Sequence, residues 1–355
     1  MTKTNLFKSI SVITDNFLSK KGDTLELSAR GSNILLFSLI QDIQKKGDIH
    51  FEVYQQGMED SCIQFKGITV HMIKCNSFLD FKKKLKEIKF NTDIVHYNNI
   101  DFFSGKIPNT YLTATIHTNS FLEKEDAKEW LHENIGLLDE VVVVNSEYMK
   151  EFKGTILIKN GIAKEIFEYN SKERNRSFPV DILFPNLNTF KKNRDFAINL
   201  VKELNSSSKY QFRLILVGEK EELSLRDEEY KFVEEKSWGK EMNRLYKESF
   251  ITIIPSFSES CSLCALESMS SGTVVIANDI FGIRDYVKDG KNGCLIDVRD
   301  MDEWKKRIFS LVIDSKEYAR IQQNARNTVI KEYNSERMSK EYYSMWLRLF
   351  EKRNG

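Results

Sequence analysis

The sequence predicts an α/β protein built from two doubly wound parallel sheets, and three observations support this prediction. The chain has 355 residues, and single hydrophobic cores stop growing at about 250 to 300 residues, so two cores are expected. Short apolar runs rich in β-branched residues alternate with helical patterns, which is typical of parallel strands joined by crossover helices. Runs such as 214–217 and 251–254 are continuously apolar, as in strands buried on both faces.

The predicted strands fall into two series separated by a polar stretch. The first series comprises residues 10–14, 93–97, 113–117, 140–145 and 156–159. The second series comprises residues 180–184, 212–217, 250–255 and 273–277. We therefore expect an N-terminal domain over residues 1–170, a linker near 169–178 and a C-terminal domain over 178–335. Apolar residues at helical spacing over 318–350 predict one or two surface helices, and we expect residues 336–355 to pack back towards the N-terminal domain.

Charge and composition exclude several classes of protein. The formal net charge is +1, so the chain lacks the positive field by which nucleic-acid-binding proteins release counterions, and no nucleic-acid partner is expected. The five cysteines are an odd number scattered through a large chain, which favours thiols over a disulfide framework. The most apolar stretches are far shorter than the roughly 20 residues that span a bilayer, and residues 1–11 lack the apolar core of a signal peptide. We therefore expect a soluble protein of the cytoplasm.

The segment 255–272 carries the most informative pattern. A predicted strand ends, small polar residues form a turn, and a helix is expected from near Ser262 to Gly272. Glu259 then lies in the loop at the carboxyl end of a parallel strand, where open α/β sheets bind ligands, and Glu267 lies within the helix. The free N–H groups at the start of this helix suit the diphosphate of a nucleotide.

In this setting the chain resembles glycosyltransferase family 4 (group 1), whose hallmark is a pair of glutamates eight positions apart in a strand-loop-helix unit. Glu259 and Glu267 match that spacing. The similarity continues through the next predicted strand and through 282–287 and 289–293, so it is unbroken from about residue 255 to 296. The resemblance implies the GT-B architecture, in which two Rossmann-like doubly wound parallel-sheet domains face a central cleft. It implies that the N-terminal domain, 1–170, binds the acceptor and that the C-terminal domain, 178–335, binds the nucleotide sugar. It also implies a retaining reaction without a metal.

The resemblance implies roles for individual residues. Glu267 would bind the ribose of the donor, while Glu259 and His117 would contact the transferred sugar as the catalytic residues. A lysine ahead of the first helix of the C-terminal domain would grip the diphosphate, with Lys192 the first choice and Lys191 the near alternative. The other donor-binding positions are expected at the start of the motif helix, namely Ser260, Cys261, Ser262 and Leu263.

Several departures from the family pattern affect the expected diphosphate site. The usual Gly-Arg of the first loop is replaced by Pro185-Asn186, which removes the arginine partner of the lysine. Ser260 and Ser262 stand where glycines let the backbone approach phosphate closely. These changes keep open the alternative of a relative that retained the fold and lost donor chemistry.

Weaker signals have simpler structural interpretations. Trp238 is a candidate for stacking on the nucleotide base, and packing in the core explains it equally well. The Asp-Met-Asp triplet at 300–302 has the form of a metal-binding motif but precedes a helical run, so a helix cap is favoured and no catalytic metal is expected. Cys261 and Cys264 have the spacing of half a metal site without a second half, which favours core packing. The basic amphipathic helix near 78–89 suits an anionic membrane surface, but a crossover helix needs the same apolar stripe.

The sequence thus predicts a retaining, metal-independent glycosyltransferase that uses a nucleotide diphosphate sugar, with UDP preferred, and no other cofactor. A non-catalytic partner subunit and a nucleotide-sugar epimerase are the alternatives, since fold alone does not fix function. The acceptor is left open among a saccharide, a lipid-linked glycan, a protein and a small molecule. Association with a membrane surface is also left open.

Overall fold

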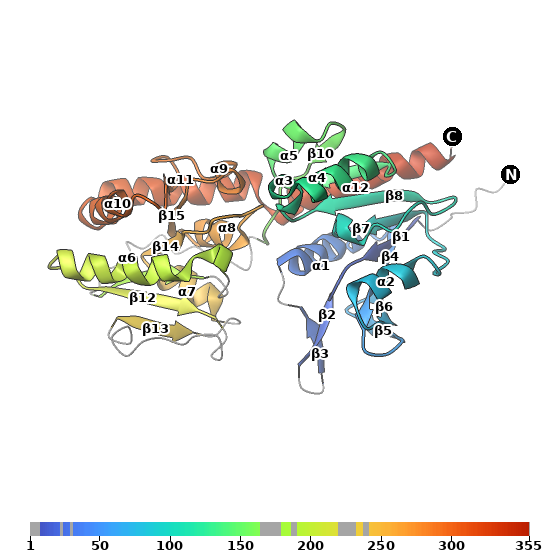
Figure 1. The fold of residues 1–355 in the computed structure, drawn as a ribbon, viewed down its shortest axis with the longest axis horizontal. Coiled ribbons are helices and arrows are strands. Elements are labelled where there is room, and N and C mark those ends of the chain that lie inside the picture. The colour runs from blue at the N-terminus through green and yellow to red at the C-terminus, as the bar shows by residue number, and fades with distance from the viewer. Residues whose placement is uncertain are drawn as a thin grey trace. The chain divides into compact units, whose positions relative to one another are not determined.

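A computed structural model describes residues 8–21, 24–28, 31–163, 179–185, 190–218, 232–236 and 241–354. The chain divides into two compact units, which are described here one at a time (Figure 1). Unit 1 consists of residues 1–161 with 335–355, and unit 2 consists of residues 162–334. The linker expected at 169–178 lies outside the described residues.

Unit 1 is built on a sheet with the strand order β10-β9-β8-β7-β1-β4-β6-β5. Its neighbouring strands are parallel except β5 and β6, which form an antiparallel pair, and a separate hairpin joins β2 to β3. The strands are β1 (Lys8–Ile13), β2 (Leu18–Lys21), β3 (Thr24–Leu27), β4 (Ile49–Gly57), β5 (Ser61–Phe65), β6 (Ile68–Lys74), β7 (Ile94–Tyr97), β8 (Tyr111–Ile116), β9 (Glu140–Val143) and β10 (Thr155–Leu157).

Helices cover both faces of this sheet. Alternate residues of a strand point to opposite faces, and in the central strands both sets are buried. On one face, β8 residues Leu112 and Ala114 share a core with α2, α4 and α5. On the other face, Thr115 bonds to the hydroxyl of Tyr342 in α12 at 2.8 Å, and the fully buried Trp346 lies one turn further along that helix. The helices are α1 (Gly31–Gln44), α2 (Phe78–Leu85), the 3-10 turn η1 (Ile100–Phe102), α3 (Ser120–Glu123), α4 (Glu125–Ile135), α5 (Ser146–Glu151) and α12 (Ser335–Asn354).

Unit 2 is built on a fully parallel sheet with the strand order β13-β12-β11-β14-β15-β16. The strands are β11 (Val180–Phe184), β12 (Phe212–Val217), β13 (Val233–Lys236), β14 (Ile251–Ile254), β15 (Val274–Asn278) and β16 (Cys294–Ile296). The helices are the 3-10 turn η2 (Phe190–Lys192), α6 (Arg194–Ser207), α7 (Met242–Glu248), α8 (Leu263–Ser270), α9 (Phe281–Arg284), α10 (Met301–Ile313) and α11 (Ser315–Glu332).

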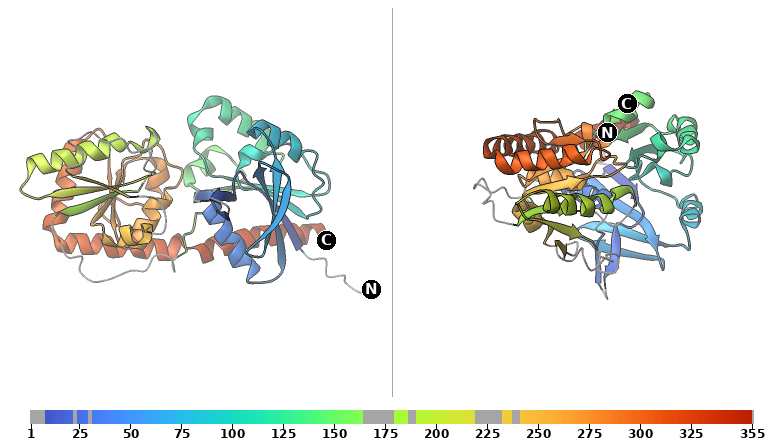
Figure 2. Two further views of the ribbon diagram at one scale, coloured as in Figure 1. Left: turned by 90° about the horizontal axis from the view of Figure 1, so that it is seen from below. Right: turned by 60° about the vertical axis from the view of Figure 1, so that its left-hand side comes forward.

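Helices lie on both faces of the sheet of unit 2 (Figure 2), and a hydrophobic core fills the space between the sheet and the helices on each face. Ile182 of β11 points into the core formed with α6 and α10, whereas its neighbour Leu183 points into the core formed with α7 and α8. Burial on both faces explains why the strands of this sheet are continuously apolar in sequence. The doubly wound arrangement that the sequence predicts is therefore confirmed for both units.

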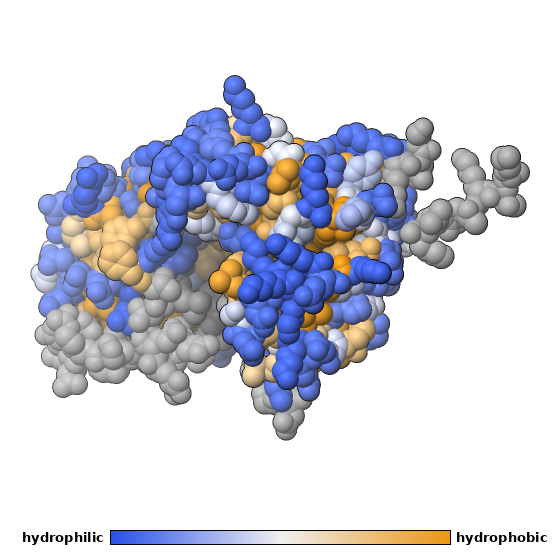
Figure 3. Space-filling view, turned by 45° about the vertical axis from the view of Figure 1, so that its right-hand side comes forward, coloured by the Kyte–Doolittle hydropathy of each residue, from blue (hydrophilic) through white to orange (hydrophobic). Residues whose placement is uncertain are grey.

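Each strand predicted from the sequence is present, with its ends within one or two residues of the expected positions. The motif helix is present as α8, and Gly272 beyond it has a φ of 76°, the left-handed conformation that favours glycine after a helix. The basic helix is present as α2, with Phe81 and Leu85 buried as a crossover helix requires. Along the described part of the chain, no helix is long and apolar enough to cross a membrane. On the face drawn in Figure 3, hydrophilic residues predominate and apolar residues form separate patches.

Candidate functional site

The strand order of unit 2 places one crevice at the carboxyl ends of β11 and β14. The chain moves outwards from β11 through β12 to β13, and then returns to add β14, β15 and β16 on the other side. In open α/β sheets, the connections that leave such a switch point diverge to opposite faces and open a ligand-binding crevice there. The residues that follow β11 and β14 along the chain are therefore the candidates for the site.

Hydrogen bonds join the two connections that leave these strands. The backbone N–H of Phe257 donates to the carbonyl of Lys191 at 2.8 Å, and the side-chain amide of Asn193 donates to the carbonyl of Pro255 at 3.3 Å. Asn193 has a φ of 60° and precedes α6, so it makes the left-handed turn into that helix. As a result, Lys192 is directed from the first connection towards the second.

Lys192 forms an ion pair with Glu259. Its Nζ lies 2.7 Å from Oε1 of Glu259, and the hydroxyl of Ser256 donates to the same oxygen at 2.8 Å. The side chain of Glu259 is 7% exposed and that of Lys192 is 27% exposed, so the carboxylate is shielded while the cation reaches solvent. The structure thus brings together two residues that the sequence assigned separately to the diphosphate and to the sugar, and those roles stay predictions.

Gly282 supports the backbone behind this ion pair. A Cβ atom at this position would lie 1.7 Å from the carbonyl oxygen of Glu259 and 3.1 Å from that of Ser260. Both contacts are to backbone, so they could not be relieved by rotating a side chain. The position of the Glu259 loop therefore depends on glycine at 282.

The second glutamate of the motif, Glu267, is half-buried on α8 and bonded to α7. The hydroxyl of Tyr246 donates to Oε2 of Glu267 at 2.8 Å. Burial raises the pKa of Glu267 to about 7, and the hydrogen bond from Tyr246 opposes that rise. A carboxyl group of this kind changes charge near neutral pH, and its second oxygen offers an acceptor for a ligand hydroxyl.

At the start of α8, a tyrosine already occupies one of the expected phosphate donors. The backbone N–H of Ser262 donates to the hydroxyl of Tyr286 at 3.3 Å. Ser260, Cys261 and Leu263 are half-buried around this end of the helix, as the sequence placed them. A diphosphate at this position would have to share or displace the tyrosine hydroxyl.

Cys264 packs in the core as the sequence predicts. Its Sγ lies 3.0 Å from the carbonyl oxygen of Pro185, and burial raises the pKa of the thiol to about 12, with the nearby Glu267 carboxyl adding to the shift. A thiol with such a pKa stays protonated at neutral pH and is therefore a poor nucleophile. Asp300 caps α10 by accepting a hydrogen bond from the N–H of Glu303 at 3.0 Å, which confirms the helix-cap interpretation of that triplet.

His117 belongs to unit 1, directly after β8. It is half-buried, and burial lowers the pKa of its imidazole to about 4, so the ring is neutral near pH 7. Its predicted partner Glu259 belongs to unit 2, so the expectation that both face one sugar remains a prediction. Trp238 and Asn186 lie outside the described residues. Over the ranges that are described, no three His, Cys, Asp or Glu side chains are grouped to hold a metal, which leaves metal independence as a prediction.

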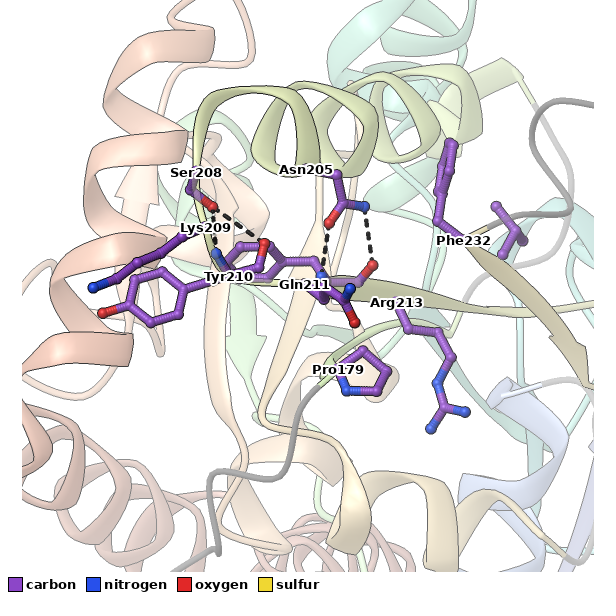
Figure 4. A pocket seen from close by; sticks show the side chains of 10 residues that line it. Pro179, Asn205, Ser208, Lys209, Tyr210, Gln211, Arg213 and Phe232 are labelled. Carbon is purple, nitrogen blue, oxygen red and sulfur yellow. Dashed lines mark hydrogen bonds between the residues drawn. The ribbon is translucent and has the colours of Figure 1, made fainter.

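A cavity of unit 2 lies at the other end of the sheet. It has a volume of about 610 Å³ and is lined by residues at the amino ends of β11, β12 and β13, including Pro179, Phe212 and Val233. Figure 4 shows Asn205 of α6 in this cavity, where its side-chain amide donates to the carbonyl of Phe212 and accepts from the N–H of the same residue. Ligands of open α/β sheets bind at the carboxyl ends of the strands, so this cavity is not the candidate site.

Sequence reasoning missed the residues that support the motif. Ser256, Gly282, Tyr246 and Tyr286 contact the glutamate loop or α8, but none of them belongs to the glutamate pair. Gly282 and Tyr286 lie within the segment that resembles the family. The resemblance therefore marked this region but assigned no role to either residue. Tyr246 lies on α7 and had no signal, because its contact depends on the packing of two helices.

Comparison with known proteins agrees with this geometry. Residues 165–328 match the model of the family described as "Glycosyl transferases group 1". The D-inositol 3-phosphate glycosyltransferase of Mycobacterium sp. (strain KMS) is 38% identical over 69 residues, which are 19% of this chain and 16% of that protein. The chain therefore spans only a small part of the length of the curated relatives that it matches.

Solved structures share the fold over nearly the whole chain. Sucrose-phosphate synthase from Thermosynechococcus elongatus superposes with a TM-score of 0.78 at 18% identity, covering 97% of this chain and 100% of that one. HepE from Anabaena, in complex with UDP and glucose, superposes with a TM-score of 0.74 at 14% identity, covering 96% and 100%. The chain has the fold of these glycosyltransferase structures, the GT-B architecture with two Rossmann-like units, and residues 165–328 carry the group 1 signature.

Proposed function

We propose that the protein is a retaining, metal-independent glycosyltransferase that transfers a sugar from a UDP-sugar to an acceptor. The observation that carries this proposal is the placement of Lys192, Glu259 and Glu267 around the switch point of a sheet whose sequence matches group 1 glycosyltransferases. A cation, a shielded carboxylate and a carboxyl in the second turn of α8 are groups that a diphosphate, a sugar and a ribose can bind. The presence of UDP in the complexes of HepE supports uridine as the nucleoside of the donor.

The residues of this chain supply binding and electrostatic stabilisation. Lys192 would leave Glu259 and move to the diphosphate, where its charge offsets the negative charge that develops as the sugar bond breaks. Glu259 would then accept hydroxyls of the transferred sugar, and Glu267 would accept those of the ribose. In a retaining reaction of this kind, the departing phosphate is thought to receive the proton of the acceptor, so no protein nucleophile is needed.

A screen of nucleotides by thermal shift tests the proposal. UDP and UDP-sugars should raise the midpoint of unfolding, because a ligand at 100 times its dissociation constant stabilises by about 2.7 kcal/mol. ADP and GDP at the same concentration serve as controls for the base. A chain that responds to none of these nucleotides would refute donor binding.

One observation favours a second candidate, a relative that binds the nucleotide without turnover. The N–H of Ser262 is already bonded to Tyr286, which leaves the helix N-terminus a weaker diphosphate site than the family pattern implies. Slow hydrolysis of a UDP-sugar, followed as release of UDP, separates the two candidates. Binding without any release of UDP, in the presence or absence of acceptors, would favour the non-catalytic relative.

A further inference from the structure

Two phenylalanine rings are exposed beside the Lys192–Glu259 ion pair. Phe190 is 88% exposed and Phe257 is 46% exposed. Their ring centroids lie 5.5 Å apart with an angle of 35° between the ring planes, so the two rings form one apolar surface. Single exposed apolar side chains are common, but two adjacent aromatic rings at a binding crevice point to a ligand.

The backbone holds the two rings in place. Phe190 is in η2 and Phe257 follows β14, and the hydrogen bond from the N–H of Phe257 to the carbonyl of Lys191 joins the two segments at 2.8 Å. Phe257 is only two residues from the shielded carboxylate of Glu259. The rings are therefore fixed next to the place where the proposed function puts the transferred sugar.

The surroundings of the rings decide which ligand they suit. Their neighbours along the chain are Lys191 and Lys192 on one side and Ser258 and Glu259 on the other. A lipid chain needs a continuous apolar surface, which these charged and polar neighbours interrupt. A pyranose ring has an apolar C–H face about the size of a phenyl ring and hydroxyls around its edge, so it matches aromatic rings with a polar border.

We propose that Phe190 and Phe257 form a platform on which the ring of a saccharide acceptor stacks. This inference rests on the proposed function and names the class of acceptor for the same site. The aromatic faces would contact the C–H groups of the sugar, and polar groups at the border would bind its hydroxyls. The acceptor ring would then lie beside the sugar held by Glu259.

Proton NMR with simple sugars tests the platform. The probes are the methyl glycosides of glucose, galactose, mannose and N-acetylglucosamine, each titrated into the full-length protein with UDP present. At least one glycoside should bind, and the protons of one face of its ring should shift upfield because they lie over an aromatic ring. Phe190→Leu and Phe257→Leu should each weaken that binding at least fivefold, whereas Phe190→Tyr should stay within twofold of the parent.

Controls separate this inference from the proposed function and from folding. Both rings are exposed, so the leucine variants should unfold and bind UDP like the parent, as should Leu79→Ala at an exposed apolar site of unit 1. Absence of glycoside binding, or leucine variants that bind as tightly as the parent, would overturn the platform. Leucine variants with a lower mass in solution would assign the rings to a contact between copies and would also overturn it. Failure of UDP to bind the parent would count against the proposed function alone, because the platform is tested by the binding of the glycosides.

Discussion

The carboxyl group of Glu267 should make donor binding depend on pH near neutrality. Burial raises its pKa to about 7, and the ionised form is the better acceptor for ribose hydroxyls. Donor binding then favours the deprotonated enzyme and weakens as pH falls below the pKa. UDP-glucose is the suitable ligand because its diphosphate ester does not titrate in this range. Its dissociation constant should be about tenfold higher at pH 6 than at pH 8, which corresponds to about 1.4 kcal/mol.

Two substitutions test the origin of this dependence. Glu267→Gln should abolish the pH dependence and weaken binding at pH 8 by about 1.5 to 3 kcal/mol, the range for hydrogen bonds to charged groups. Tyr246→Phe should move the dependence to higher pH, because the hydrogen bond that lowers the pKa is lost. Glu248→Gln, at an exposed position on α7, should leave binding unchanged. Calorimetric titration from pH 6 to 8 provides the measurement.

The same carboxyl group affects folding with a defined sign. Its folded pKa of about 7 lies above the ordinary value of 4.5, so protonation favours the folded state and the ionised form destabilises it. Glu267→Gln should therefore stabilise the ligand-free protein at pH 8, by up to about 3 kcal/mol, and have little effect at pH 4. A glutamine variant that binds UDP-glucose like the parent at every pH would refute the assignment of Glu267 to the ribose. A variant that is less stable at pH 8 would refute the electrostatic reasoning.

Four further predictions follow from the structure. Gly282→Ala should destabilise the protein by about 1 to 3 kcal/mol in urea unfolding and weaken UDP binding, because its Cβ would lie 1.7 Å from a backbone oxygen. Gly136→Ala, where the added Cβ meets open space, is the control and should leave the free energy of unfolding unchanged. Turnover should fall by on the order of a hundredfold in Lys192→Ala, and a double variant with Lys191→Ala that stays within about threefold of the parent would show that the loop is wrongly assigned. Burial lowers the pKa of His96 to about 3, so this residue should contribute a loss of stability of about 1.4 kcal/mol per unit as pH falls from 6.5 towards 3, because the unfolded chain takes up the proton first; the profile of His96→Gln should be less steep than that of the parent by this amount, with the contributions of His117 and Glu267 left in place. Turnover should persist in excess chelator, and activity that is lost there and restored by Mn²⁺ would contradict metal independence.

Most of the strands that the sequence predicted are buried on both faces, and several of the strands that it missed are not. β11 and β12 were predicted to the residue, since their apolar runs have sharp ends. β5 has alternating half-buried and exposed residues, and β3 is exposed along most of its length, so neither carries a buried apolar signal. β4 is interrupted by polar residues such as Gln55, whose amide bonds to both backbone groups of Leu18. Strands of this kind are defined by their partners rather than by their own composition.

The sequence predicted those residues of the candidate site that lie close to one another along the chain. Glu259 and Glu267 lie in one strand-loop-helix unit, so spacing and capping signals sufficed to place them. The ion pair with Lys192 was not derivable from spacing, because it joins residues 67 positions apart through the order of the strands. The sequence suggested that the lysine binds phosphate, and the structure shows that its partner within the protein is Glu259.

The polar groups of the candidate site are paired with one another. Lys192 is paired with Glu259, and the N–H of Ser262 donates to the hydroxyl of Tyr286, so the cation and the backbone donor both have partners within the protein. A shielded charge without a partner would cost far more free energy than this paired arrangement. Donor binding is then an exchange of partners, in which the diphosphate takes the lysine and frees Glu259 to accept sugar hydroxyls. A nucleotide with a diphosphate but no sugar would leave that carboxylate without a new partner. Under the proposed function, the sugar therefore contributes to affinity by replacing the lysine at Glu259, and UDP-glucose should lose more affinity than UDP when Glu259 is changed to alanine.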